Sequence, residues 1–223
     1  MNTRFNCVLA LVCAIMLGGC AAPARVDQMV VSGQPAQRVS QSPLRGNIAV
    51  SDVTGGRETN PMWKSNVGSS EFSQALESSL RTVGLLSPTR QSGNYTLTAH
   101  LQNVEQPAFG FDMTVTASIL YAVVERKTGK TVFNRTIALP YTAKMGDAFA
   151  GVERLKLANE GAIRTNITRL IDELFTLKIE GVSVVPPSAN TEESLKELKR
   201  LKDSGLITND VYLERQKTIL GSQ

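Results

Sequence analysis

The sequence contains little of what enzymes and metal proteins commonly use. Its 223 residues include one histidine, three cysteines and only 5% aromatic residues. The histidine, His100, has no second histidine with which to share a metal ion, and no serine or cysteine stands at the spacing of a catalytic motif. The sequence also has no Gly-x-Ser-x-Gly elbow and no complete phosphate-binding loop. We therefore expect His100 to be an ordinary surface residue and the protein to be no enzyme, with no cofactor and no metal ion.

Cysteine is absent after position 20, and this absence limits how the fold is stabilised. Cys7, Cys13 and Cys20 all lie near the start of the chain, whereas disulfide scaffolds spread their cysteines through the fold. The formal net charge is +4, and the basic residues are scattered among acidic ones. A nucleic-acid-binding protein would need a basic patch. We therefore expect stability from an apolar core and no nucleic-acid partner.

The N-terminal apolar run, residues 8–17, is too short to cross a bilayer comfortably. It follows Arg4 and ends in Leu17-Gly18-Gly19-Cys20, and small residues at this place are typical of a secretory signal peptide. The stretch resembles the lipobox of bacterial lipoproteins. An N-terminal anchor helix with an incidental cysteine is the alternative.

The resemblance to lipoproteins implies a location. Residues 1–19 would be the signal peptide, and Cys20 would be the lipidated residue that starts the mature chain. Several acyl chains, at about 0.8 kcal/mol for each buried methylene, make a stable membrane anchor. Ala21, not aspartate, follows Cys20. By the sorting rule of that family, this implies the periplasmic face of the outer membrane.

Residues 20–45 contain the predicted lipidated cysteine and then a stretch rich in alanine, proline, glutamine and serine. This composition, with little periodicity, predicts a tether that is flexible or partly extended. Residues 29–31 could add an edge strand. Farther on, Trp63 is the only tryptophan, and it could either anchor a partner or fold onto the edge of the core.

The strongest secondary-structure pattern covers residues 111–141. Starting with Phe111, every odd position up to 123 is apolar, which is the period of a strand with one buried face. Positions 120, 122 and 124 are apolar as well, so we expect the later half to be covered on both faces. Gly129 can close a turn before the return strand. The pattern predicts a β-hairpin around which the rest of the chain packs.

Further segments place this hairpin in an α+β domain over residues 46–179. We expect a strand over 47–53 ended by Gly55-Gly56, a helix capped by Ser69 or Ser70 and ended by Gly84, a strand over 95–101 and a helix over 152–177. Five side chains of the last helix are expected opposite its apolar stripe: Lys156, Glu160, Arg164, Thr168 and Asp172. The order β-α-β-β-β-α predicts two helices on one face of a largely antiparallel sheet.

This order and the opening Asn47-Ile48-Ala49-Val50 resemble the amino-terminal domain of TolB. They are also similar to related envelope lipoproteins, including penicillin-binding-protein activators and curli secretion subunits. The resemblance implies a non-enzymatic role in the cell envelope. Within the domain, the loop over 144–151 carries Met145 and Phe149, which could either bind a partner or tuck beneath the loop.

The C-terminal part contains a linker over 180–190 and a helical hairpin over 191–221. A leucine helix, then Gly205-Leu206-Ile207-Thr208, then a helix with Tyr212 near its start resemble the short C-terminal domain (SHOCT) family, with a departure at Asp210-Val211. Two helices of this size bury too little apolar area to fold alone. Six apolar residues are therefore expected to contact a partner surface: Leu195, Leu198, Leu201, Leu206, Ile207 and Tyr212. That surface could belong to another envelope protein, to a second copy or to the protein's own domain.

Two functions follow from these patterns. The first is a lipid-anchored periplasmic adaptor that recruits or assembles envelope proteins through the C-terminal hairpin. The alternative is a binding module for a lipid or another apolar ligand, auxiliary to an envelope transport system. The alternative requires an apolar groove between the sheet and its helices.

Overall fold

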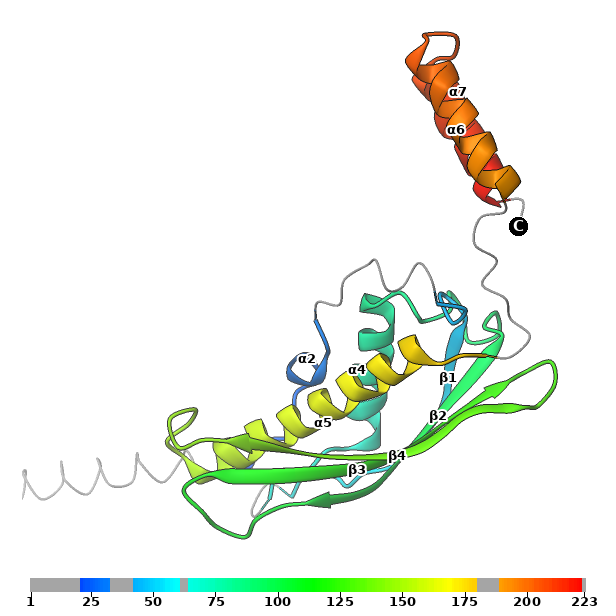
Figure 1. Cartoon of the computed structure of the whole chain (residues 1–223). Coiled ribbons are helices and arrows are strands. Elements are labelled where there is room, and N and C mark those ends of the chain that lie inside the picture. The colour runs from blue at the N-terminus through cyan, green and yellow to red at the C-terminus, as the bar shows by residue number, and fades with distance from the viewer. Residues whose placement is uncertain (1–20, 33–41, 61–63, 180–188, 222–223) are drawn as a thin grey trace, which may run out of the picture. The chain divides into compact units, whose positions relative to one another are not determined.

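A four-stranded sheet organises the N-terminal part of the chain (Figure 1). The computed structural model describes residues 21–32, 42–60, 64–179 and 189–221. The chain divides into two units, Met1–Ile179 and Glu180–Gln223. Each unit is considered by itself below, and the first is called the α+β domain.

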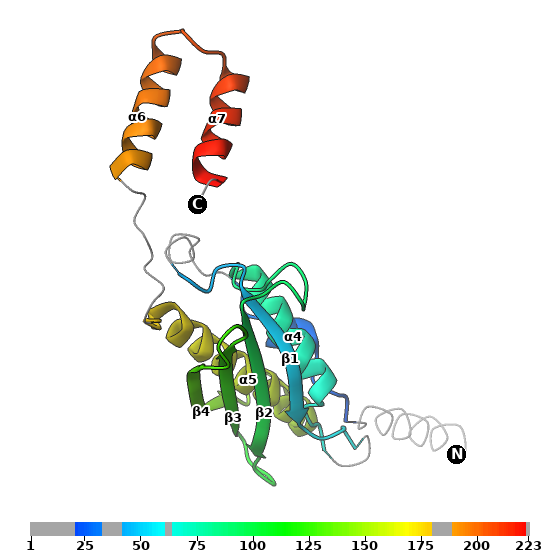
Figure 2. The ribbon, with the colours of Figure 1, turned by 90° about the vertical axis from the view of Figure 1, so that its right-hand side faces the viewer.

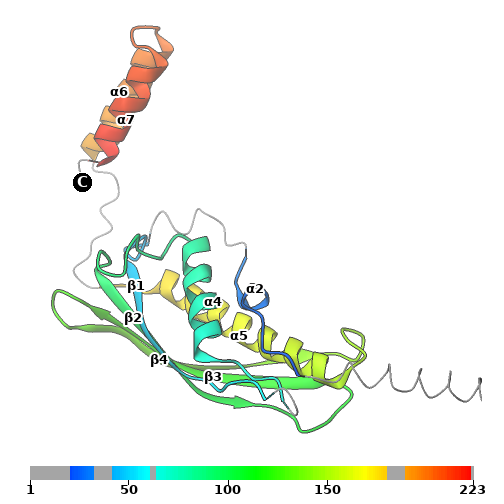
Figure 3. The same cartoon turned by 180° about the vertical axis from the view of Figure 1, so that it is seen from behind.

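The sheet has the strand order β1-β2-β3-β4. β1 pairs with β2 in parallel, and the other pairs are antiparallel. Its strands are β1 (Ile48–Gly55), β2 (Tyr95–Glu105), β3 (Met113–Glu125) and β4 (Thr131–Ala143). The long helices α4 (Ser69–Thr82) and α5 (Gly151–Thr176) and the short α2 (Val26–Met29) lie on one face of the sheet (Figure 3). The predicted β-α-β-β-β-α order and the α+β class are confirmed.

β3 supplies the centre of the core, as its alternation predicts. Its odd positions are all buried: Met113, Val115, Ala117, Ile119, Tyr121 and Val123. Phe111 does not belong to this set, because the strand begins at Met113 and Phe111 is 78% exposed in the preceding turn. The prediction that both faces are covered is also wrong: Leu120, Ala122 and Val124 are only half-buried, since the described helices lie on the other face.

Two glycines take the places predicted for them, one in a turn and one at the end of a strand. Gly129 has a φ of 71° in the β3–β4 turn, and its N–H donates to the Glu125 carbonyl at 2.8 Å. At the end of β1, Gly55 has a φ of 78°, and a Cβ there would lie 2.1 Å from the Leu101 carbonyl oxygen. The predicted serine cap of α4 is wrong. Gly68 occupies the N-cap position, and Ser69 already belongs to the helix.

The N-terminal segment 21–32 packs against the domain, so the prediction of a tether is wrong there. Ala21, Ala24, Met29 and Val31 are at most 5% exposed. Met29 ends α2 and does not belong to an edge strand. A second part of the predicted tether, residues 42–45, includes the fully buried Leu44.

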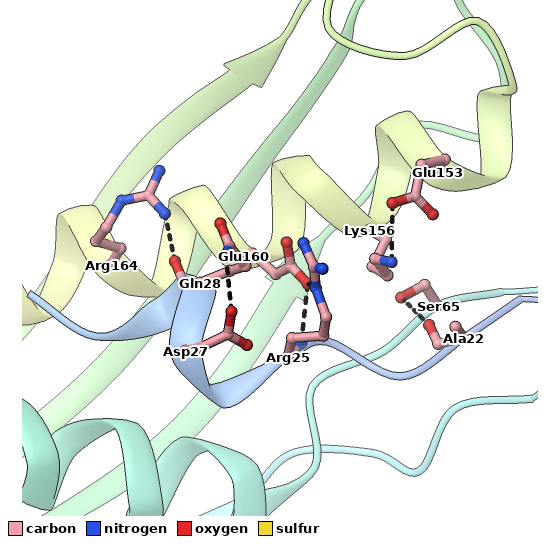
Figure 4. Close-up of polar contacts among 9 residues, drawn as sticks. All are labelled: Ala22, Arg25, Asp27, Gln28, Ser65, Glu153, Lys156, Glu160 and Arg164. Atoms are coloured by element: carbon pink, nitrogen blue, oxygen red, sulfur yellow. Dashed lines mark hydrogen bonds and ion pairs between the residues drawn. The ribbon is translucent and has the colours of Figure 1, made fainter.

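The docked segment also changes the environment of α5. Lys156 and Glu160 were expected to face solvent, but they are only 7% and 1% exposed. Segment 21–32 covers this side of the helix, as Figure 4 shows for Arg25 beside Glu160. The helix itself lies within one residue of its predicted bounds at both ends.

The C-terminal unit contains two helices, α6 (Ala189–Asp203) and α7 (Asn209–Gly221), joined by a short turn (Figure 2). Gly205 has a φ of 73° in that turn. The Leu206 N–H donates to the Leu201 carbonyl at 3.0 Å. The predicted helical hairpin is therefore present. In the described parts of the chain, no helix is both long and apolar enough to cross a membrane.

Candidate interaction sites

The docked N-terminal segment runs along α5 in the same chain direction (Figure 4). Arg164 donates to the carbonyl of Gln28. Three residues earlier in the segment, the Arg25 N–H donates to Glu160 Oε1 at 2.9 Å. Ala22 lies farther along, beside Lys156, nearer the start of the helix. The first described residues of the chain therefore lie toward the N-terminal end of α5.

Glu160 makes the central polar contact between segment 21–32 and α5. Its side chain is 1% exposed, and the half-exposed Arg25 guanidinium lies 3.5 Å away at Nε. A hydrogen bond to a charged group stabilises by about 1.5–3 kcal/mol, more than a neutral one does. The carboxylate therefore fixes the segment on the helix at Arg25.

A second polar cluster joins the segment to the β2–β3 turn, residues 106–112. Ser65 Oγ donates to the Ala22 carbonyl at 2.8 Å. The Ser65 carbonyl in turn accepts from Gln106 Nε2 at 3.0 Å and from Asn159 Nδ2 at 2.9 Å. Gln106 is the first residue of the turn. The start of the described chain, this turn and α5 are thus held together at one place.

A third polar cluster lies inside the core and is structural. The Tyr121 hydroxyl donates to Asn166 Oδ1 at 3.0 Å. Asn166 Nδ2 donates to the carbonyls of Ala117 and Ile137, at 2.9 and 2.8 Å. Burial raises the pKa of Tyr121 well above its ordinary value of 10. The tyrosine therefore stays protonated at neutral pH and connects β3 to α5.

Two pockets of the domain are lined largely by polar residues. One, of about 320 Å³, lies where Gly55 and Gly56 meet β2 and includes His100, Gln102 and Gln106. His100 is exposed, as predicted, and its Nδ1 lies 2.8 Å from Thr54 Oγ1. Among the described residues, no group of three or more histidine, cysteine, aspartate or glutamate side chains could hold a metal ion.

The space between the sheet and its helices is occupied by side chains. Phe72 and Leu76 of α4, and Ile163 and Ile167 of α5, are fully buried there. They belong to the same cluster as the inward residues of β3. No observation on the described residues thus favours the alternative function, which requires an apolar groove at this place.

The six predicted contact residues of the hairpin fall into different environments. Leu198 is 7% exposed, whereas Leu206 in the turn is 71% exposed. The other four are half-buried: Leu195, Leu201, Ile207 and Tyr212. The Lys202 ammonium lies 4.4 Å from the centre of the Tyr212 ring, within the range of a cation–π contact. The hairpin thus buries one of these leucines and leaves another outside.

Two exposed apolar residues of α7 were missed: Val211 at 42% and Leu213 at 46%. Val211 stands where the sequence departs from the short C-terminal domain pattern, and that departure was the available clue. The predicted lipobox, Leu17, Gly18 and Gly19 with Cys20, lies outside the described residues. Trp63 does as well.

Comparison with known proteins gives distant likenesses only. No family model and no curated protein matches the chain, so the resemblances to TolB and to the short C-terminal domain stay predictions. A provisionally assigned lipoprotein from Caulobacter crescentus CB15 has a TM-score of 0.44 and 15% identity, over 64% of this chain and 96% of its own.

Two further solved structures are similar at the same level. A PelC dodecamer from Paraburkholderia phytofirmans has a TM-score of 0.42 and 14% identity, over 60% of this chain and 90% of the PelC chain. Protein XCC0632 from Xanthomonas campestris, of the DUF330 family, has a TM-score of 0.41 and 12% identity, over 59% of this chain and 80% of its own. Likenesses this distant carry no argument about what this chain does.

Proposed function

We propose that this protein is a lipoprotein of the bacterial cell envelope, anchored at Cys20 on the periplasmic face of the outer membrane. In this proposal it is not an enzyme but an adaptor, which binds another envelope protein through its C-terminal hairpin. The observation that carries the proposal is the exposure of Leu206, Val211 and Leu213 on the hairpin.

Burial of the exposed apolar side chains of the hairpin would supply free energy for binding a partner. Fully burying a leucine or valine side chain is worth about 1.5–3 kcal/mol. The two helices have only 15 and 13 residues, and a unit this small gains little stability from its own core. A partner that covers the turn and the start of α7 would add the missing burial.

The experiment is site-specific photo-cross-linking of the membrane-bound, full-length protein in cells. A photoreactive amino acid at Val211 is expected to give one discrete adduct with an envelope protein. Leu206→Asp places a charge at the exposed leucine and is expected to abolish the adduct. Ser204→Asp places the same charge two residues away and serves as the matched control, which is expected to keep it.

Two outcomes would contradict the proposal. If the same adduct persists in Leu206→Asp, the hairpin is not the contact. If only a ladder of unspecific adducts forms, it recruits no defined partner. An adduct with twice the mass of the protein would instead show self-association, and the hairpin would then join copies of this chain.

A further inference from the structure

One end of the α+β domain carries large apolar side chains that no described residue covers. Phe109 and Phe111, in the β2–β3 turn, are 88% and 78% exposed. Phe149 and Met145, in the β4–α5 loop, residues 144–150, are 90% and 46% exposed. Exposed apolar patches mark contact sites with proteins or membranes. We call this pair of loops the apolar end.

The two loops lie at the same end of the sheet and are tied together. Met113 of β3 pairs with Ala143 of β4, so the turn before β3 adjoins the loop after β4. The Met145 N–H donates to Asp112 Oδ1 at 3.0 Å. Figures 1 and 3 show both loops where α5 begins.

The buried Arg154 side chain donates hydrogen bonds to backbone carbonyls of both loops. Arg154 is 6% exposed. Nη1 donates to the carbonyls of Ala148 and Phe149, at 2.7 and 2.6 Å, and Nη2 reaches the Gly110 carbonyl at 3.4 Å. The aromatic side chains therefore project from fixed backbone, so inserting them elsewhere requires little further ordering.

The start of the described chain lies at this same end. Ala22 is linked through Ser65 to Gln106, the first residue of the β2–β3 turn. One peptide bond separates Ala21 from Cys20, the residue that carries the lipid in the proposed function. Because Ala21 is buried on the domain, no length of free chain remains between the anchor and the apolar end.

We propose that the apolar end inserts Phe109, Phe111 and Phe149 into the interfacial layer of the bilayer that holds the lipid anchor. This inference rests on the lipidation of Cys20 in the proposed function. We expect the apolar end to contact lipid and not a protein, because the anchor holds this end of the domain at the bilayer surface. The domain would then stand on the membrane in a fixed orientation.

The charges of the apolar end specify how it binds. The turn and the loop together carry one lysine, Lys144, and two aspartates, Asp112 and Asp147. Buried Arg154 offsets the excess negative charge. Attraction to anionic lipid therefore contributes little, and burial of apolar surface supplies the binding. Neutral phosphatidylcholine is expected to suffice.

The test measures the depth of a tryptophan placed at the apolar end. Full-length lipidated protein is reconstituted into phosphatidylcholine vesicles with and without brominated acyl chains. Phe149→Trp, at a 90% exposed position, is compared with Lys127→Trp in the β3–β4 turn. The 13 residues of β3 separate the two positions by about 40 Å. The wild-type protein supplies the background from Trp63.

Bromine is expected to quench the Phe149→Trp emission and to leave Lys127→Trp at background. The Phe149→Trp emission is also expected to shift to shorter wavelength on reconstitution. Equal quenching of the two variants would overturn the inference. A photoreactive amino acid at position 149 of the membrane-bound protein in cells would overturn it as well if it gave an adduct with a second copy or with another protein. Vesicle flotation separates the two proposals. Protein that floats without quenching contradicts only this inference, whereas protein that does not float contradicts the anchor and with it both proposals.

Discussion

The α+β domain and the C-terminal hairpin use their apolar residues in opposite ways. In the domain, every inward residue of β3 from Met113 to Val123 is buried beneath α4 and α5. In the hairpin, Leu198 is buried but Leu206, Val211 and Leu213 are exposed. The domain therefore has a core of its own, whereas in the proposed function the hairpin gains further burial from a partner. Four substitutions test this contrast.

The largest expected effect is on the core of the domain. Asn166→Ala removes the partner of Tyr121 and of the carbonyls of Ala117 and Ile137 at once. Each buried group left without a partner costs about 1–3 kcal/mol, so we expect the free energy of unfolding to fall by about 3–5 kcal/mol. Denaturant titration followed by circular dichroism measures it.

The matched control for this variant is Asn134→Ala on β4, where the asparagine is exposed. It is expected to change the free energy of unfolding by less than about 0.5 kcal/mol. Equal losses in the two variants would show that Asn166 does not hold the core together.

The second prediction concerns the hairpin alone. Leu198→Ala removes its buried leucine and is expected to cost the hairpin about 2 kcal/mol. This is enough to melt α6 and α7 in the purified protein, while the cooperative unfolding of the domain stays unchanged. Amide hydrogen exchange resolves the two units. Leu206→Ala, at an exposed position, is expected to leave both as they are; a change in domain unfolding would argue against two independent units.

The third prediction weakens the docking of the N-terminal segment. Glu160→Gln keeps the size of the side chain but removes its charge beside Arg25. We expect a loss of about 1–2 kcal/mol at this contact, with faster amide exchange over residues 21–31. Glu153→Gln, whose carboxylate is 46% exposed, is expected to leave exchange there unchanged. Unchanged exchange in Glu160→Gln would mean that apolar contacts alone hold the segment.

The smallest effect is the response of the domain to alkaline pH. Burial raises the pKa of Tyr121, so the folded protein keeps this proton at a pH where the unfolded chain releases it. The resulting stability is present below the ordinary pKa of about 10 and is lost as pH rises above it. Tyr121→Phe is expected to cost about 1 kcal/mol at neutral pH.

The same variant is expected to flatten the decline of stability above the ordinary pKa of tyrosine. Thermal melts over a series of alkaline buffers measure this slope. An unchanged slope would assign the decline to other groups, such as Tyr95, whose pKa burial also raises.

The sequence predicted the parts of the fold that have a period. Alternation located β3, and the apolar stripe located α5, because a long regular element repeats the same spacing of apolar residues many times. Phe111 was misplaced for the same reason: it continues the alternation, although the strand begins at Met113. A turn residue that follows the pattern cannot be told apart in one sequence.

The docked segment could not be predicted, because its contacts are few and specific. α2 has four residues, too few to show a helical period, and its composition resembles that of a linker. Its partner Glu160 lies opposite the apolar stripe of α5, so the sequence predicted an exposed charge there. In the structure Arg25 covers it. Of the apolar end, the sequence offered Met145 and Phe149 as candidates for binding a partner or for tucking beneath the loop, and both are exposed. Its place beside the start of the chain was missed, because that depends on this docking.

Hydrogen exchange of the hairpin in its native membrane tests the central contrast most directly. The full-length protein is labelled in isolated envelope membranes and, separately, after purification in detergent. We predict that the amides of α6 and α7 exchange more slowly in the membranes than after purification, while those of β3 and α5 are protected in both. Equal protection of the hairpin in both samples would contradict the account, because the hairpin would then need no partner.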